Sequence, residues 1–216
     1  MAIIGVKHLM YAPITNYTVG SRPTYGTGAV LAKLTKVDYS PNKADADFYA
    51  DDVKAEEEHC VTGGTITIGV DDLTQDVQKG IFGNATETQS TIKVLCKGAN
   101  DESPYVGVGY VIPHKRGGSR VYEAVLLLRV MFSEPSESAE TKGETISFQG
   151  KEIEGSFSPV EGYENDRYRE SAEFSTESAA DEWLKGKLNV TAPLRSAASA
   201  PAATTTTNTN TSGSGK

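Results

Sequence analysis

The chain has 216 residues, 38% of them hydrophobic, and a formal net charge of −8. The length suits one domain of ordinary size, and the modest hydrophobic content predicts a core that gains stability from neighbouring subunits. An acidic chain without a basic stripe is a poor match to general nucleic-acid binding, because phosphates are neutralised by Lys and Arg.

Neither a disulfide scaffold nor a membrane anchor is predicted. Cys60 and Cys96 are the two cysteines, and they lack the CxxC spacing of metal and redox motifs. The opening MAIIGVKHLMYAP has no hydrophobic region of signal-peptide length, and no apolar stretch is long enough to cross a membrane. We therefore expect a protein that is made and kept in a reducing cytoplasm, with no membrane partner.

The first forty residues predict two strands. Residues 3–11 and 29–39 alternate apolar with polar side chains, which is the period of a half-buried strand. Gly, Thr, Ser and Pro are frequent in residues 16–27 and predict a loop between the two strands. The sequence Ser40-Pro41-Asn42 is expected to end the second strand.

Residues 41–64 are expected to form a long acidic loop, because more than twenty residues show little regular pattern. Between Asp45 and Glu58 there are seven acidic residues against one base, Lys54, so this stretch carries −6 of the net charge. Phe48 and Tyr49 give the segment apolar surface to bury. A charged segment with aromatic anchors predicts a region that faces a partner.

The next elements are two strands and a helix. Residues 65–70 and 91–97 predict strands, the first because β-branched residues alternate with Thr. Asp71-Asp72 is expected to cap a short helix that Gly83 closes. Apolar residues recur in this helix at a spacing of four: Leu73, Val77 and Ile81.

The strongest pattern predicts a central hairpin. Residues 105–112 form its first strand, residues 114–120 a polar turn around Gly117-Gly118, and residues 121–132 its second strand. The apolar run at residues 124–128 predicts a strand that is covered on both faces.

The remaining elements complete a mostly β domain over residues 1–191. Strands are expected at residues 143–148, 152–157 and 168–174, and Ser175 or Thr176 is expected to cap a short helix through Leu184. The composition of residues 192–216 is typical of a flexible tail rich in Ala, Thr and Ser. We predict a sandwich or partial barrel with one or two short flanking helices.

No arrangement of residues predicts catalysis, and no cofactor or metal is expected. His59 and Cys60 are adjacent, and adjacent side chains of an extended chain point to opposite sides. The acidic residues between Asp51 and Glu58 lack the spacing and central Gly of a calcium loop, and there is no phosphate-binding GxxxxGK motif. We therefore expect that the protein is not an enzyme.

Five stretches, in this order, resemble the major tail proteins of siphophages, in particular the phi13-type family, and span most of residues 1 to about 174. They are GVKHLMYAPI, DADFYADDVKAEEE, TITIGVDDLTQDVQKGIFG, SPYVGVGYVIPHK and VYEAVLLLRVMFSEPSESAETKGETISFQGKEIEGSF. The resemblance implies a tail-tube β-sandwich or partial barrel whose subunits form hexameric rings. The Ala/Thr/Ser-rich end departs from the family's compact pattern.

The resemblance also implies a place and partners. Rings would stack around the tape measure protein, between the tail terminator and the distal tail proteins, and DNA would pass through the lumen as cargo. The protein would be made in the bacterial cytoplasm and end in the virion.

The loop at 41–64 is then expected to reach the next ring. Our hypothesis for the contacts pairs this acidic segment with the basic turn of the central hairpin. The residues concerned are Phe48, Tyr49, Asp51, Asp52, Glu56 and Glu57 in the segment and Lys115, Arg116 and Arg120 in the turn.

Two other classes of function remain open. A carbohydrate-binding or adhesin-like sandwich would gather aromatic residues on one face, whereas Tyr105, Tyr110 and Tyr122 are spread along a hairpin. A small hydrolase would need a polar constellation that the sequence does not display.

Overall fold

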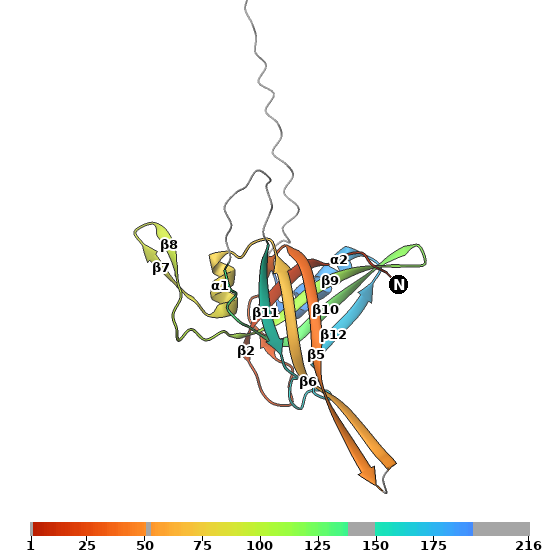
Figure 1. Cartoon of the computed structure of the whole chain (residues 1–216). Helices are drawn as coiled ribbons and strands as arrows, with labels where there is room; N and C mark the ends of the chain where they lie inside the picture. The colour runs from red at the N-terminus through yellow and green to blue at the C-terminus, as the bar shows by residue number, and fades with distance from the viewer. Residues whose placement is uncertain (1, 51–52, 138–149, 192–216) are drawn as a thin grey trace, which may run out of the picture.

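The computed structural model describes residues 2–50, 53–137 and 150–191. The protein is mostly β, with one large antiparallel sheet, a separate two-stranded ribbon and two short helices in this described part (Figure 1). The mostly β class with short flanking helices, predicted from the sequence, is confirmed.

The elements of the first half are β1 (Ala2–Ile3), β2 (Lys7–Asn16), β3 (Thr24–Tyr25), β4 (Ala29–Ala32), β5 (Leu34–Ala50), β6 (Val53–Val70) and α1 (Gln75–Phe82). Those of the second half are β7 (Ala85–Gln89), β8 (Ile92–Cys96), β9 (Tyr105–Arg116), β10 (Ser119–Phe132), β11 (Lys151–Phe157), β12 (Arg169–Phe174) and α2 (Glu177–Leu188). The large sheet runs in the order β3-β2-β9-β10-β11-β6-β5, and β7 pairs with β8 outside it.

β10 passes through the centre of the molecule and buries both of its faces. Six apolar side chains in the middle of the strand divide between two apolar clusters, and each of the six is fully buried. One cluster takes Val125, Leu127 and Val130, and the other takes Ala124, Leu126 and Leu128. The apolar run therefore lies in a doubly covered strand, as predicted.

An irregularity in β10 folds the sheet over itself. β10 pairs with β12 along residues 122–127 and with β11 at residues 130–132, on either side of a shift in its pairing with β9. β11, β6 and β5 therefore form a layer against β2, β9 and β10 (Figure 1), with Ile66 and Ile153 in the shared cluster. α2 packs on the opposite face through Leu184 and Leu188.

Two glycines of β9 allow this close approach of α2. A Cβ at Gly109 would lie 2.8 Å from Leu184, and a Cβ at Gly107 would lie 2.5 Å from the ring of Tyr25. Both distances are shorter than ordinary packing contacts, so these positions favour glycine for lack of space. The two glycines serve packing between helix and sheet.

The caps of the helices agree with the prediction at two of four ends, and α2 runs to Leu188 instead of ending at the predicted Leu184. Thr176 caps α2 and Gly83 closes α1 in the left-handed region, both as predicted. Asn189 closes α2. The cap of α1 is Thr74 and not Asp71-Asp72, because the Asp71 carboxylate accepts hydrogen bonds from the backbone N–H of Lys33 and of Asp72 instead (both 2.9 Å).

The predicted break at Ser40-Pro41-Asn42 and the predicted loop at residues 41–64 are both wrong. β5 and β6 continue through this region as one long hairpin, with Pro41 paired opposite Gly64. Proline is tolerated there because β5 is the last strand of the sheet, where a missing N–H donor can face outward.

Other expectations have different outcomes. β7 was not predicted, since its residues Ala-Thr-Glu-Thr-Gln show no apolar alternation. The strand expected at 143–148 and the tail at 192–216 lie outside the described residues. Neither helix of the described ranges is long and apolar enough to cross a bilayer.

Candidate assembly surfaces

The outer half of the β5–β6 hairpin extends away from the body of the protein (Figure 1). β11 pairs with β6 only over residues 64–70, so the hairpin's two strands pair solely with each other beyond Gly63 within the described ladder. We call residues 43–61 the acidic arm. Its eight residues from Lys43 to Ala50, at about 3.3 Å each, give it a length of about 25 Å.

The structure places the predicted arm residues on this extension. Phe48 and Tyr49 lie in β5, and Glu56 and Glu57 lie in β6, with Phe48 paired in register with Glu56. For these four the backbone alone is described, and Asp51 and Asp52 lie outside the described residues. The arm therefore carries the −5 charge of its sequence on a hairpin and not on a loop.

Aromatic rings fix the root of the arm to the body. The rings of Tyr39 and Phe157 stack with centroids 5.0 Å apart, and Phe157 stacks on Tyr168 at 5.6 Å. A Cβ at Gly64 would lie 2.3 Å from the Ser40 carbonyl oxygen, so the two strands and the Phe157 ring close tightly at this level. The arm thus leaves a rigid base.

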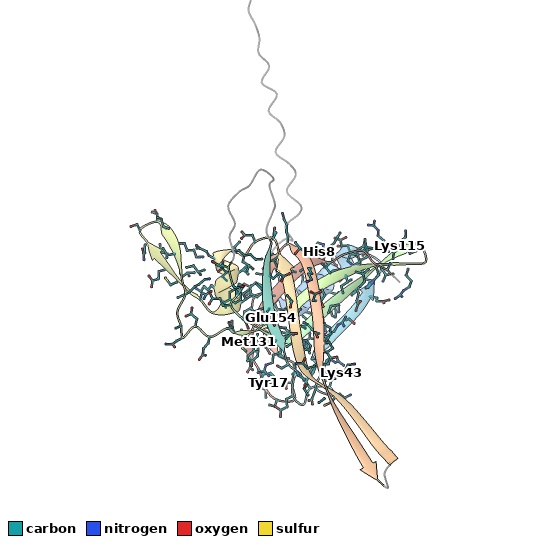
Figure 2. All side chains as sticks on the ribbon, viewed as in Figure 1. His8, Tyr17, Lys43, Lys115, Met131 and Glu154 are labelled. Atoms are coloured by element: carbon teal, nitrogen blue, oxygen red, sulfur yellow. The ribbon has the colours of Figure 1, made fainter. Side chains whose placement is uncertain are left out.

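The β9–β10 hairpin ends in a second exposed element, which we call the basic tip (residues 114–121). Gly117 and Gly118 have φ angles of 55° and 90°, the left-handed values that a two-residue hairpin turn needs. β1 lies alongside β9 here, with Ala2 opposite Lys115. The basic tip and the acidic arm lie at separate ends of the molecule, and Figure 2 labels Lys115 at the tip and Lys43 at the root of the arm.

The register divides the three cations of the basic tip between two faces. Ala2, Lys115 and Arg120 are successive partners across β1, β9 and β10, so their side chains share one face. Arg116 is one residue further along β9 and lies on the opposite face. It donates to both carboxylate oxygens of Glu173, at 3.0 and 2.8 Å.

The face of Arg116 continues as a row of charge pairs that sequence reasoning missed. Nε2 of the buried His114 lies 3.0 Å from one carboxylate oxygen of Glu123, and Arg169 donates to the other oxygen at 3.0 Å. Glu123 and Glu173 are register partners on β10 and β12. Charges on this face are therefore neutralised within the subunit.

A second ionic cluster, around a nearly buried carboxylate, connects a loop, α2 and β12. The nearly buried carboxylate of Glu170 lies 3.2 Å from Arg22, 3.2 Å from Lys187 and 3.6 Å from Arg167. Three cations around one carboxylate join a loop, α2 and β12. Their separation in sequence by up to 165 positions explains why no local motif indicated them.

A third cluster joins β2 to α2. Lys7 donates to Glu177 at 2.9 Å, and the ring nitrogens of His8 lie 2.6 Å from Glu177 and 3.7 Å from Asp181. Burial raises the pKa of Asp181 above its usual range. Burial also acts to raise the pKa of Glu177, but hydrogen bonds from His8 and Lys7 outweigh it and hold that pKa below the usual range.

These clusters connect structural elements, and their geometry does not suggest a reaction. The contacts of His8 and His114 are with carboxylates. Cys60 is exposed on β6. Within residues 2–50, 53–137 and 150–191, no three Asp, Glu, His or Cys side chains are grouped so that they could bind a metal ion.

The outer face of β5, β6 and β11 is polar. Its rungs are Asp38–Thr67–Glu154 and Ser40–Thr65–Ser156, while Ile66 and Ile153 point from the same strands into the core. Nζ of Lys36 forms an ion pair with a carboxylate oxygen of Asp38 at 2.5 Å. Figure 2 shows Glu154 on this layer.

No protein-family model matches the sequence, and no curated protein is similar to it. The structural features that bear on function are therefore the acidic arm, the basic tip and the polar sheet face.

Proposed function

We propose that the protein is the major tail-tube subunit of a long-tailed bacteriophage, a structural protein that assembles head to tail through its acidic arm. The observation that carries the proposal is the arm itself. It extends about 25 Å from the body with a sequence charge of −5, at a separate end of the molecule from a basic tip.

An arm of this kind contributes little to the stability of its own subunit. A two-stranded hairpin without a packed face is marginal in water, and like charges on neighbouring strands repel. A cationic surface on a second copy would remove that repulsion. The arm is therefore best explained by a partner.

The arrangement also favours a stack over a closed dimer. The arm and the basic tip are different surfaces, so their contact is heterologous, and a heterologous contact that does not close builds an open assembly. The six-fold rings are supported by the resemblance to siphophage tail proteins. β5 ends the order of the large sheet, so its outer edge offers unpaired backbone groups to a ring neighbour.

The polar face of β5, β6 and β11 suits the wall of a lumen. Asp38, Glu152 and Glu154 outnumber Lys36 on it, so the face would repel phosphates and let DNA pass. The tape measure protein would occupy this lumen during assembly, and the terminator and distal tail proteins would contact the two ends of the tube. We assign no catalytic residue and no cofactor.

The test is electron microscopy of the purified full chain over a concentration series, with and without the tape measure protein. The matched variant replaces residues 44–60 by Asn-Gly, which joins the register partners Lys43 and Val61 through a two-residue turn. We expect tubes or rings with a central hole from the natural chain and none from the variant. Monomers alone from the natural chain, even with the tape measure protein present, would contradict the proposal.

One observation favours the alternative of a β-sandwich binding module. The guanidinium of Arg129 lies over two rings, 4.9 Å from the centroid of Tyr17 and 3.9 Å from that of Tyr105, and Met131, the register partner of Tyr105, is exposed. Aromatic surface of this kind can bind a sugar or a peptide. A glycan array with a Tyr105→Ala control would detect such binding.

A further inference from the structure

The basic tip has one face that is neutralised within the subunit and one that is not. On the first face Arg116 and Arg169 occupy the two nearby carboxylates, Glu173 and Glu123. On the second face Lys115 and Arg120 are exposed, and neither has a hydrogen bond or an ion pair to any residue of the described ranges. This face therefore presents two uncompensated positive charges.

Apolar surface lies beside these charges. Ile3 is the register partner of His114 and therefore lies on the first face. Ile4 follows on the second face, where it remains 52% exposed, and its N–H donates to the carbonyl of Pro113 at 2.9 Å. An exposed isoleucine next to two cations makes a surface that suits a segment with both acidic and aromatic side chains.

The acidic arm is such a segment, and it cannot reach the tip of its own subunit. The arm starts at the root near Lys43 and points away from the end that carries Lys115 (Figure 2). A contact between arm and tip must therefore join two copies. The −5 charge of the arm, with Phe48 and Tyr49 in it, complements the charge and the apolar border of the tip.

We propose that the face of the basic tip formed by Lys115 and Arg120, bordered by Ile4, is the docking site for the acidic arm of a second copy. Arg116 is not part of it, because that side chain lies on the other face and binds Glu173. The proposal rests on the tube-subunit function and names the surface that receives the arm.

Two variants made in the full chain allow this contact to be measured without tube growth. The variant Lys115→Glu/Arg120→Glu keeps its arm and loses its docking face. The variant with residues 44–60 replaced by Asn-Gly keeps its docking face and loses its arm. Each should be monomeric alone, and a mixture should give a heterodimer with one of each in analytical ultracentrifugation.

The matched control is Arg116→Glu in the armless variant. It reverses one cation on the opposite face, as the single variant Lys115→Glu does on the docking face, and should bind the tip-reversed chain with an affinity within about threefold of the parent. Lys115→Glu/Arg120→Glu in the armless variant should weaken binding by about 10-fold to 100-fold. Raising the salt from 0.05 to 0.5 M should weaken the parent heterodimer, because exposed charges are screened.

The outcomes separate the two proposals. If no heterodimer forms while the natural chain still builds tubes, the docking face is wrong and the tube function stands. Equal weakening by Arg116→Glu and by Lys115→Glu/Arg120→Glu would also overturn the docking face. If the heterodimer forms but the natural chain never builds tubes, the docking face stands and the tail-tube function fails.

Discussion

The two long hairpins of the protein differ in what holds them. β9 and β10 have neighbours on both sides, β2 and β1 along β9 and β12 and β11 along β10, and both faces of β10 are buried. The β5–β6 hairpin is held in the same way only at its root, where Ile66 and Ile68 join the core. Its outer part pairs with itself.

The two hairpins therefore divide two roles: the β9–β10 hairpin stabilises the fold, and the outer β5–β6 hairpin is available for interaction. Burial stabilises the β9–β10 hairpin up to its last turn, and only the basic tip remains free to bind. In the β5–β6 hairpin the division falls near Asn42 and Gly63, and everything beyond is available for a partner. Substitutions in the two hairpins should therefore affect different measurements.

The largest effect on folding is expected in the centre of β10. Leu126 is fully buried between the sheet and α2, in the same cluster as Leu184 and Leu188. Leu126→Ala removes that contact and leaves a cavity, so the free energy of unfolding should fall by about 2–5 kcal/mol. Urea denaturation measures it, and a loss below about 1 kcal/mol would show that α2 moves in to fill the space.

The next largest effect on the free energy of unfolding is expected where α2 approaches β9. Gly109→Ala places a Cβ 2.8 Å from Leu184, and we expect it to lower the free energy of unfolding by about 1–3 kcal/mol. Gly186→Ala in α2 is the matched control, because nothing lies within 4 Å of its added Cβ and alanine favours a helix. It should stabilise by up to about 1 kcal/mol in thermal unfolding, so opposite signs are expected.

For the acidic arm we expect little effect on the stability of the subunit and a large effect on assembly. Replacing residues 44–60 by Asn-Gly removes a segment without core contacts beyond Gly63, so the free energy of unfolding should change by less than about 1 kcal/mol. The same variant should lose assembly. A large loss of stability, measured by urea denaturation at a concentration where both chains are monomeric, would show that the arm supports the body.

The better-held hairpin was also the easier one to predict. An apolar run at 124–128 and the Gly117-Gly118 turn are local signals of a buried hairpin, and the structure has both. The acidic arm was predicted as a loop because its strands do not pack on a core, so no alternation is required of them. Pro41 also suggested a break, but a proline does not have to end an edge strand, because its missing N–H can face outward there.

The contacts within the candidate surfaces could be predicted only in part. The sequence indicated the acidic segment and the basic turn, but it grouped Lys115, Arg116 and Arg120 together. Their division between two faces depends on the register with β1 and on Glu173, which is 57 positions from Arg116. Such pairings arise from the folded sheet and leave no local pattern.

The smallest effects are expected where α2, which supports the stable hairpin, meets β2. The pKa of Asp181 is raised by burial, so the ionised carboxylate costs stability above that pKa, and the cost disappears as the pH falls through it. Asp181→Asn should therefore stabilise at pH 7, by less than about 1 kcal/mol, and its advantage should shrink towards pH 4.

The pKa of Glu177 is lowered by the hydrogen bonds from His8 and Lys7, which outweigh its burial. The stability that Glu177 contributes is therefore present at neutral pH and is lost as the pH falls through the folded pKa. Glu177→Gln should therefore destabilise at pH 7 by less than about 1 kcal/mol and have less effect in acid. Urea denaturation of both variants at pH 7 and pH 4 checks the opposite signs, and the same sign at pH 7 would mean that the two carboxylates, both near His8, act as one unit.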